Sequence, residues 1–153
     1  MNILMTALQP GGGIRTFFRY IYGQQVFKNY KFTLVAPDEG LENYLLSVLP
    51  VGRFQLVPAR PGRIGFVSQV RQLAKSNRFD IVHSHGFSAG LLTQLALTGV
   101  KTPHLMTGHD MFTEPLFFGF SGSLKRLLIR AMLSQVTAVH TVTEDAKRTI
   151  LEF

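Results

Sequence analysis

The sequence predicts an α/β domain with a doubly wound, mainly parallel sheet and helices on both faces. Short apolar runs alternate with amphipathic helix patterns along the whole chain. The runs are apolar at successive positions, which is typical of parallel strands covered on both faces. No linker or low-complexity tract interrupts the alternation, so we expect one domain over residues 1–153.

Six strands and six helices are expected in alternation. The strands are predicted at Asn2–Thr6, Phe32–Ala36, Phe54–Pro58, Asp80–His83, His104–Thr107 and Thr137–Val142. The helices are predicted at Ile14–Phe27, Leu41–Val48, Phe66–Ser76, Ala89–Leu97, Leu124–Leu133 and Glu144–Leu151. The first helix is recognised by an apolar stripe, formed by Ile14, Phe17, Phe18, Ile21 and Tyr22.

The last two helices carry further signals. A leucine stripe with neighbouring Lys and Arg residues marks the fifth helix, and we expect this stripe to pack on the sheet. The alternative is a peripheral membrane contact, made together with the apolar residues 116–120. The sixth helix begins with Thr143 as a plausible N-cap and stops at Phe153 without a C-terminal signal, so we expect the chain to be a piece of a longer protein.

Composition limits the possible classes of protein. The chain has 153 residues, 46% of them hydrophobic and 16% charged, which is typical of a globular domain. It has no cysteine, which excludes a disulfide scaffold and fits a cytosolic protein. The net charge of +7 is compatible with phosphorylated ligands, anionic lipid or nucleic acid. No aromatic-basic motif supports nucleic acid, so none is expected as a partner.

A glycine turn follows the first predicted strand. Gly11, Gly12 and Gly13 lie between this strand and the first helix, with Arg15 just inside the helix. Glycines let a ligand approach the backbone, and the first N–H groups of a helix attract anions. The turn matches neither a dinucleotide fingerprint nor a P-loop, because Thr16 replaces the third glycine and no Gly-Lys-Ser/Thr follows. A phosphate-binding turn and a plain structural turn both remain open.

Polar residues also follow other strands, and the carboxyl ends of parallel strands lie at one edge of the sheet. Arg60 and Arg63 follow the third strand within a stretch that lacks acidic residues. The fourth and fifth strands end at His83-Ser84-His85-Gly86 and Gly108-His109-Asp110. A metal site at the histidines is a weaker alternative to a metal-free site, because the spacing defines no third ligand. His104 and His140 lie earlier in their strands and are expected to be structural.

In their order, these motifs resemble a known family. The matching segments are Leu4–Arg15, Phe79–Gly86, Met106–Asp110 and Val139–Glu144. Together they are similar to the N-terminal, acceptor-side domain of GT-B fold glycosyltransferases, specifically the retaining glycosyltransferase family 4. The resemblance implies a Rossmann-like domain that forms half of a two-domain enzyme. The C-terminal domain that binds the donor is absent from this chain, and Gln9 stands where inverting relatives often place a histidine.

The resemblance also implies roles for residues. His109 matches the histidine that reaches the transferred sugar or the acceptor. Gly11, Gly12, Gly13 and Arg15 would approach the donor diphosphate, and no metal or other cofactor is implied. Arg60 and Arg63 lie where such enzymes vary to fit their acceptors. Further acceptor-binding residues are expected at His85, Asp110 and Glu144.

The expected function is therefore sugar transfer from a nucleotide-sugar donor to an acceptor hydroxyl, in the synthesis of a cell-envelope glycan or glycolipid. The isolated chain should be inactive, since half of the active-site cleft would be missing. A sugar or lipid-linked acceptor, and a cytoplasmic location at the inner face of the membrane, fit this interpretation. The alternative is a non-catalytic α/β module that binds a phosphorylated ligand; a metal hydrolase built on His83, His85 and His109 is a third hypothesis.

Overall fold

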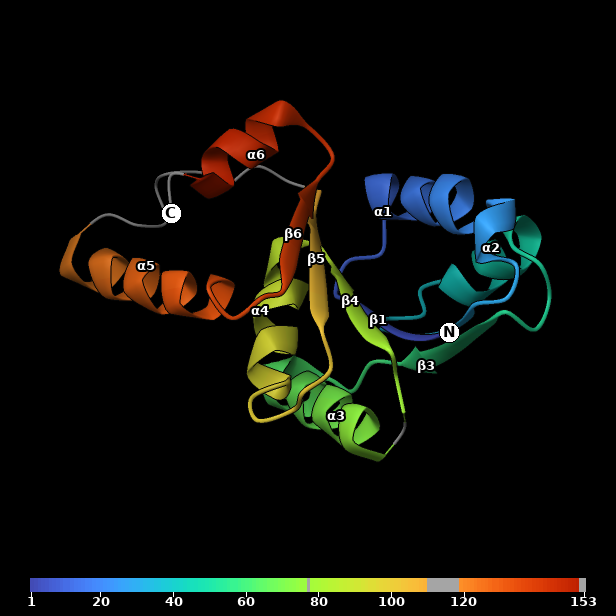
Figure 1. The fold of residues 1–153 in the computed structure, drawn as a ribbon, viewed down its shortest axis with the longest axis horizontal. Coiled ribbons are helices and arrows are strands. Elements are labelled where there is room, and N and C mark those ends of the chain that lie inside the picture. The colour runs from blue at the N-terminus through green and yellow to red at the C-terminus, as the bar shows by residue number, and fades with distance from the viewer. Residues whose placement is uncertain (77, 110–118, 152–153) are drawn as a thin grey trace.

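The computed structural model describes residues 1–76, 78–109 and 119–151. Its centre is a six-stranded, entirely parallel sheet in the order β3-β2-β1-β4-β5-β6 (Figure 1). The strands are β1 (Asn2–Ala7), β2 (Lys31–Ala36), β3 (Phe54–Pro58), β4 (Ile81–His85), β5 (His104–Gly108) and β6 (Ala138–Thr141). This arrangement confirms the predicted fold class.

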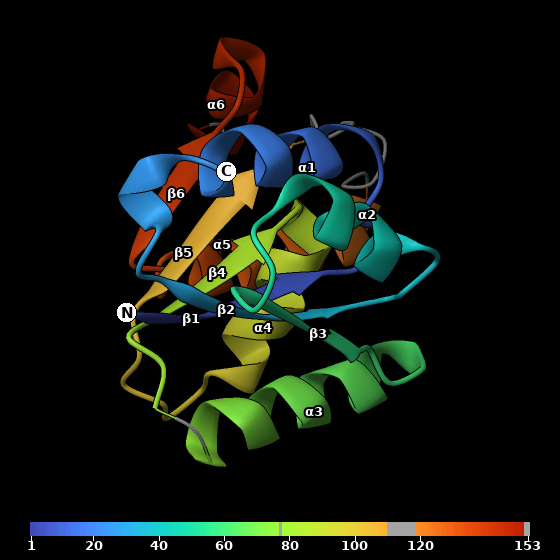
Figure 2. The same ribbon diagram turned by 90° about the vertical axis from the view of Figure 1, so that its right-hand side faces the viewer.

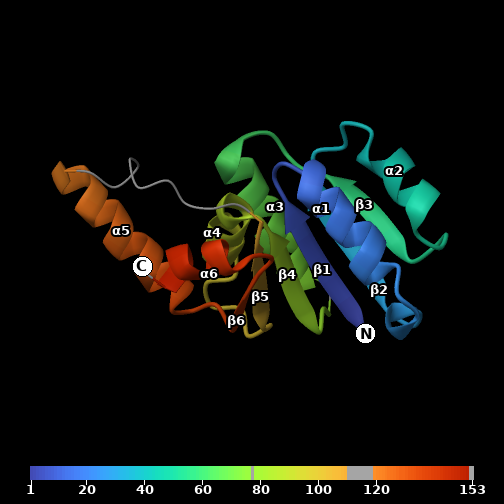
Figure 3. The same ribbon diagram turned by 90° about the horizontal axis from the view of Figure 1, so that it is seen from above.

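Helices cover both faces of the sheet. They are α1 (Gly12–Phe17), α2 (Leu41–Val48), α3 (Gly62–Ser76), α4 (Phe87–Ala96), α5 (Gly119–Leu133) and α6 (Glu144–Leu151). Figures 2 and 3 show α1 and α2 on one side of the sheet, with α3 and α4 on the other. Each side has its own apolar core: Phe18 and Phe32 belong to the first, and Phe66 and Val82 to the second. Successive residues of the central strands thus point into different cores, which explains why the strands are apolar at successive positions.

Strand order reverses next to β1. The chain moves from β1 outward through β2 and β3, and then returns to the other side of β1 as β4. The connections that leave the carboxyl ends of β1 and β4 therefore diverge to opposite sides of the sheet. Ligands of open α/β sheets bind in the crevice that such a reversal creates. The glycine turn follows β1, and His85 ends β4, so both lie at this point of the fold.

The first predicted helix is not continuous. We expected one helix over Ile14–Phe27, whereas α1 ends at Phe17 and a π-helical turn, η1, follows at Phe18–Tyr22. A separate 3₁₀ turn, η2, occupies Gln25–Phe27. Phe18 and Tyr22 are buried on the sheet, whereas Ile21 is exposed. The π-helical turn is a local change of helical register, of a kind that often occurs at functional sites.

The leucine stripe of α5 does not pack on the sheet, which corrects our expectation. Leu124, Leu127 and Leu128 are 54%, 63% and 56% exposed. α5 contacts α4 and extends beyond the β6 end of the sheet (Figure 3). The apolar residues 116–118 lie outside the described residues. Among those described, no helix is long and apolar enough to cross a membrane.

α4 packs closely on the sheet through Gly90 and a buried histidine. A Cβ atom on Gly90 would lie 2.7 Å from Cγ of Met106 and 3.3 Å from Oγ of Ser84, and would also overlap Sδ of Met106. The buried His104 ring contacts the Gln94 side-chain oxygen at 2.7 Å and the Ser84 hydroxyl at 2.8 Å. Since an amide oxygen only accepts, His104 Nδ1 donates to Gln94 and Nε2 accepts from Ser84.

Replacing Gly90 with alanine should destabilise the chain by about 1–3 kcal/mol, because the buried Met106 would have to move in a filled core. Urea unfolding measures the effect. Ser88→Ala, at an exposed position of the same helix, is the matched control and should change stability by less than about 0.5 kcal/mol. Equal stabilities for the two variants would contradict the close contact.

Acid should destabilise the chain through His104. Burial lowers the pKa of His104 from 6.5 to about 4. Between these values the unfolded chain binds a proton that the folded chain does not, so stability falls as the pH falls. The slope is at most about 1.4 kcal/mol per pH unit for this residue. His104→Gln should show a smaller loss of stability than the unsubstituted chain between about pH 6.5 and pH 4.5 in urea unfolding; equal losses would contradict the assignment.

Candidate functional site

A pocket of about 460 Å³ lies at the carboxyl end of β1. Its wall is formed by the glycine turn and the start of α1, together with one residue from each of two other connections, Glu39 after β2 and His109 after β5. The structure thus brings together the predicted donor-side residues Gly11, Gly12, Gly13 and Arg15 with the predicted catalytic residue His109. The roles assigned to these residues stay predictions.

The glycine turn exposes backbone donors to the pocket. Gly11 N–H donates to the Gln9 carbonyl at 2.8 Å, and Ile14 N–H donates to the Gly11 carbonyl at 3.0 Å. Between them, the N–H groups of Gly12 and Gly13 have no acceptor among the described residues. Gly12 has φ +41°, a conformation that side chains rarely adopt. The turn can therefore offer two N–H groups to a bound acceptor.

Arg15 holds the turn in place as well as lining the pocket. Its Nε donates to the Pro10 carbonyl at 2.9 Å, and one Nη donates to the Glu39 backbone carbonyl at 3.2 Å. The guanidinium also lies over the Tyr44 ring, 5.4 Å from its centroid. These contacts fix the positive charge beside the glycines while leaving other N–H groups of the fork for a ligand.

Glu39 is a wall residue that the sequence analysis did not include. It lies between β2 and α2, and its φ of +28° is unusual for a residue with a side chain. Asp38-Glu39-Gly40 follows the carboxyl end of β2, so the rule that polar strand ends mark a site applies to it as well. Glu39 is exposed, and it brings an acidic residue to the set of residues that line the pocket.

A chain of hydrogen bonds leads from His109 into the interior. His109 Nε2 and His85 Nδ1 are 3.3 Å apart, and His85 Nε2 lies 3.0 Å from the Tyr22 hydroxyl. The same hydroxyl is 2.6 Å from Nδ1 of His83, whose Nε2 lies 2.7 Å from the Thr107 hydroxyl. Five side chains from β4, β5, the π-helical turn and the β5 connection are thereby linked.

Burial keeps the three inner members of this chain, Tyr22, His83 and His85, uncharged. Burial lowers the pKa of His83 from 6.5 to about 3, with a further lowering from neighbouring histidines. The pKa of His85 is also lowered, by burial first and then by the other histidines, and burial raises the pKa of Tyr22. Phe17 contributes to the enclosure, because its ring lies edge-on to the rings of His85 and His109 at 5.3 and 5.5 Å. Neutral groups that both donate and accept therefore connect the pocket with the core.

His85 does not line the pocket. The ring is 1% exposed and lies one hydrogen bond behind His109. An acceptor molecule could reach it only through a rearrangement of Phe17 or His109, so the predicted acceptor role is indirect in this conformation. Tyr22 and His83 were not expected to belong to the site. Tyr22 falls on an apolar helical stripe and is typical of a core residue in sequence.

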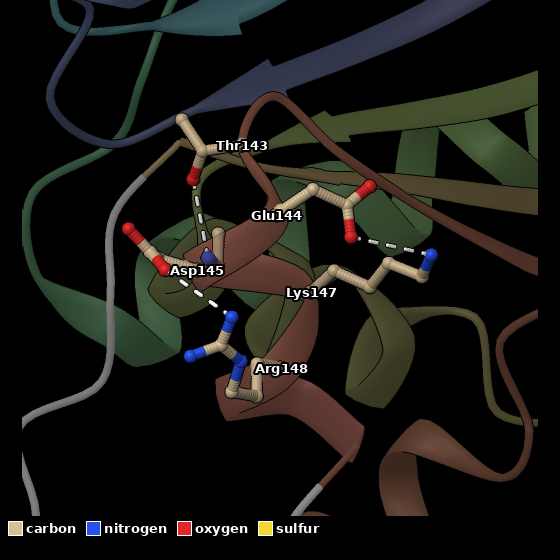
Figure 4. A network of polar contacts seen from close by, with 6 residues as sticks. Thr143, Glu144, Asp145, Lys147 and Arg148 are labelled. Atoms are coloured by element: carbon tan, nitrogen blue, oxygen red, sulfur yellow. Dashed lines mark hydrogen bonds and ion pairs between the residues drawn. The ribbon is translucent and has the colours of Figure 1, made fainter.

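The remaining predicted acceptor residues lie apart from the pocket lining. Arg60 and Arg63 are exposed before and within the first turn of α3, where Arg60 donates to the Gln72 side chain at 3.3 Å. Glu144 is exposed at the start of α6, with its carboxylate 3.4 Å from Lys147 (Figure 4). Asp110 lies outside the described residues. Their roles in acceptor binding stay predictions.

The start of α6 confirms one local prediction. The Ala146 N–H donates to the Thr143 hydroxyl at 3.1 Å, so Thr143 caps the helix (Figure 4). Asp145 pairs with Arg148 at 3.9 Å, and these ion pairs lie at the surface. The ion pair with Lys147 is sufficient to explain the orientation of the Glu144 side chain, and no ligand is needed for it.

Among the described residues, the histidines are not grouped as ligands of a metal ion. Within residues 1–76, 78–109 and 119–151, no group of three or more His, Asp or Glu side chains has the geometry to hold a metal ion. His83 uses both ring nitrogens in hydrogen bonds to Tyr22 and Thr107. The described residues therefore lend no support to the metal-hydrolase hypothesis.

Comparison with solved structures identifies related folds. The chain resembles HepE from Anabaena, solved in complex with UDP-glucose, with a TM-score of 0.72 and 15% identity. It also resembles the UDP-GlcNAc 2-epimerase from Neisseria meningitidis bound to UDP-GlcNAc, with a TM-score of 0.65 and 16% identity. The matches cover 99% of this chain but only 40% and 43% of those proteins. At such low identities the likeness concerns the fold. No curated protein sequence matches significantly.

The family comparison agrees with the resemblance found in the sequence. Residues 12–153 match the model of the glycosyl transferase 4-like domain, which includes most of the glycine turn, both His-containing strand ends and α6. The fold is the Rossmann-like half of a GT-B architecture, as expected. The chain therefore belongs to the family of glycosyl transferase 4-like domains.

Proposed function

We propose that this chain is the acceptor-side domain of a retaining glycosyltransferase, which moves a sugar from a nucleotide-sugar donor to an acceptor hydroxyl. The observation that carries the proposal is the pocket between the glycine turn and His109, at the point where strand order reverses, in a glycosyl transferase 4-like domain. Other glycosyltransferase-like folds of this shape have been solved with UDP-sugars, which supports a nucleotide-sugar donor.

The donor diphosphate would lie against the glycine turn. Two N–H groups that have no acceptor among the described residues, together with the fixed charge of Arg15, would stabilise the negative charge that develops on the departing diphosphate. Such donors are most effective when held in place before the reaction, and the contacts of Arg15 to Pro10 and Glu39 do this. The proposed mechanism needs no metal ion or other cofactor, because these groups supply the positive charge.

His109 would contact the transferred sugar or the acceptor hydroxyl. A Cβ atom placed on Gly13 would lie 3.8 Å from His109 Nδ1, so the ring faces the glycine turn across the pocket. A sugar bound there would lie between the backbone donors and the imidazole. Glu39, on the same wall, could accept a hydrogen bond from a further sugar hydroxyl.

A second domain would complete the site. The chain spans about 40% of the length of the proteins whose structures it resembles, and we propose that a C-terminal donor-binding domain closes over the pocket. The 153-residue chain alone would then transfer no sugar. We further propose a sugar or lipid-linked acceptor for cell-envelope synthesis, brought to a cytoplasmic enzyme at the inner membrane face by exposed surfaces such as α5.

Gly13→Val tests the pocket. Its Cβ has no close neighbour, so folding should be nearly unaffected, while the added methyl groups occupy the space before His109. In the longer protein that contains the second domain, kcat/KM for sugar transfer should fall roughly 100-fold, because a displaced substrate loses its reactive geometry. Thr16→Val, at an exposed position one helical turn away, is the control.

Two results would contradict the proposal in different ways. Full transfer activity of Gly13→Val would show that the pocket does not take part in the reaction. Binding of a phosphorylated ligand without sugar transfer by the longer protein would instead favour the non-catalytic module. Sugar transfer by the isolated chain would contradict the need for a second domain.

Replacing Arg60 and Arg63 with alanine tests the proposed acceptor surface. Both side chains are exposed and neither supports the core, so stability should be unchanged within about 0.5 kcal/mol. If the acceptor is anionic, its KM should rise about tenfold in the longer protein, and added salt should reduce the difference because it screens exposed charges. Arg78→Ala, which removes an exposed charge at the opposite end of α3, is the control. An unchanged KM would exclude an acceptor role for this pair.

A further inference from the structure

Tyr44 contacts Arg15 in two ways from outside the pocket. The Arg15 guanidinium lies over its ring, with the central carbon 5.4 Å from the ring centroid, and its hydroxyl donates to the Arg15 backbone carbonyl at 2.9 Å. Tyr44 is half-buried on α2 and is not among the residues that line the pocket. A side chain that contacts both the charged end and the backbone of one residue limits the rotation of that residue.

The backbone at Arg15 accepts this contact without losing a helical bond. The N–H of Phe18, at the end of α1, donates to the carbonyls of Ile14 and Arg15. A carbonyl oxygen has two lone pairs, so the Arg15 carbonyl can accept from Phe18 and from Tyr44 at the same time. The hydroxyl therefore ties the end of the short α1 helix to α2, close to the start of the π-helical turn.

The turn before α2 holds another part of the guanidinium. The Nη2 nitrogen of Arg15 donates to the carbonyl of Glu39 at 3.2 Å. Glu39 has φ +28°, a strained conformation that persists only where surrounding contacts fix it. The turn is also fixed to α2, because the Asp38 carboxylate accepts from the Glu42 N–H at 3.1 Å. The orientation of Arg15 thus depends on α2 and the turn that precedes it, through the Tyr44 ring and the Glu39 carbonyl.

These contacts occupy one edge of the guanidinium and leave another. Nε and the adjacent Nη2 donate to the carbonyls of Pro10 and Glu39. A guanidinium has five N–H groups in a fixed plane. The hydrogens of Nη1 and the second hydrogen of Nη2 have no acceptor among the described residues. A bound anion would therefore meet Arg15 through its Nη nitrogens and not through Nε.

We propose that Tyr44 is a positioning residue that, with the Glu39 carbonyl, fixes the guanidinium of Arg15 so that only its Nη nitrogens are left for an anion in the pocket. Tyr44 acts through Arg15 and does not touch the anion. That the anion is the diphosphate of a nucleotide-sugar rests on the proposed function; the fixed orientation of Arg15 does not. Arg15→Lys would keep the charge but lose the planar fork that stacks on Tyr44 and donates to two carbonyls.

NMR of Arg15 tests its orientation in the ¹⁵N-labelled 153-residue chain without any ligand. In ¹H–¹⁵N spectra, the signal of Arg15 Nε–H is assigned by its loss in Arg15→Lys. Exchange of this hydrogen with water should be about tenfold slower than for the exposed Arg63, because it is hydrogen-bonded and its group is stacked on a ring. Equal exchange rates at the two residues would overturn the proposal.

Tyr44→Leu should release the guanidinium. The exchange rate of Arg15 Nε–H should then rise toward that of Arg63, whereas Tyr44→Phe, which keeps the ring and loses only the hydroxyl, should retain most of the protection. Tyr20→Leu is the control, because it removes a similar stack from Arg19, 5.3 Å from the Tyr20 centroid, and should leave Arg15 unchanged. Unchanged protection in Tyr44→Leu, or equal losses in the Leu and Phe variants, would contradict the role of the ring.

A double-mutant cycle with inorganic pyrophosphate tests whether Tyr44 acts through Arg15. In titration calorimetry of the same chain, Tyr44→Leu should weaken pyrophosphate binding about tenfold, because a displaced cation loses a charge-assisted contact. In an Arg15→Lys background, which is already weakened, the same substitution should have no further effect. Equal weakening in both backgrounds would show a merely structural role of Tyr44 and overturn the proposal.

Two remaining outcomes are also informative. If Tyr44→Leu does not fold, Tyr44→Met, whose unbranched side chain adapts to irregular sites, is measured in its place with the same expected results. A chain that binds no pyrophosphate although Arg15 is protected, and loses this protection in Tyr44→Leu, would count against the diphosphate site of the proposed function and would support the positioning of Arg15 by Tyr44.

Discussion

Two histidine rings can be buried beneath α1 because the Tyr22 hydroxyl bonds to both of them. His83 and His85 point from β4 into the same core as Phe18 and Phe32, where an unpaired imidazole would be costly. The hydroxyl comes from the π-helical turn that follows α1. The burial of the two β4 histidines therefore depends on this irregular turn. A regular helix would deliver the same side chain to a different position over the strand, since the π-helical turn changes the residue spacing.

This buried polar layer supports the pocket from behind. The glycine turn, Arg15 and Glu39 form one wall through backbone contacts, whereas His109 is held through side chains that reach into the core. The two walls thus have different origins and different chemistry. One presents N–H groups and a positive charge, and the other presents an imidazole ring that is hydrogen-bonded to the buried His85. The nucleotide-sugar donor proposed above joins a charged diphosphate to a hydroxyl-rich ring, and it would place these two parts against the two walls.

The sequence was sufficient to predict the fold and the edge of the sheet at which the pocket lies, because both follow from periodicity and from the rule for parallel strands. It correctly placed Thr143 as a helix cap and brought His109 and the glycines to one edge. It could not predict the inner partners. Tyr22 has the position of a core residue in an apolar stripe, and its role depends on a contact with His83, 61 positions later.

The hydrogen-bonded chain also has a consequence for folding. Its members come from segments near residues 22, 83 and 107, and they meet only when β1, β4 and β5 are all paired. Contacts between such distant parts of a sequence form slowly, because a long loop must close before any bond is gained. We therefore expect the arrangement around His109 to form late in folding, and a partly folded chain that contains only the β1–β2–β3 half of the sheet would still lack it.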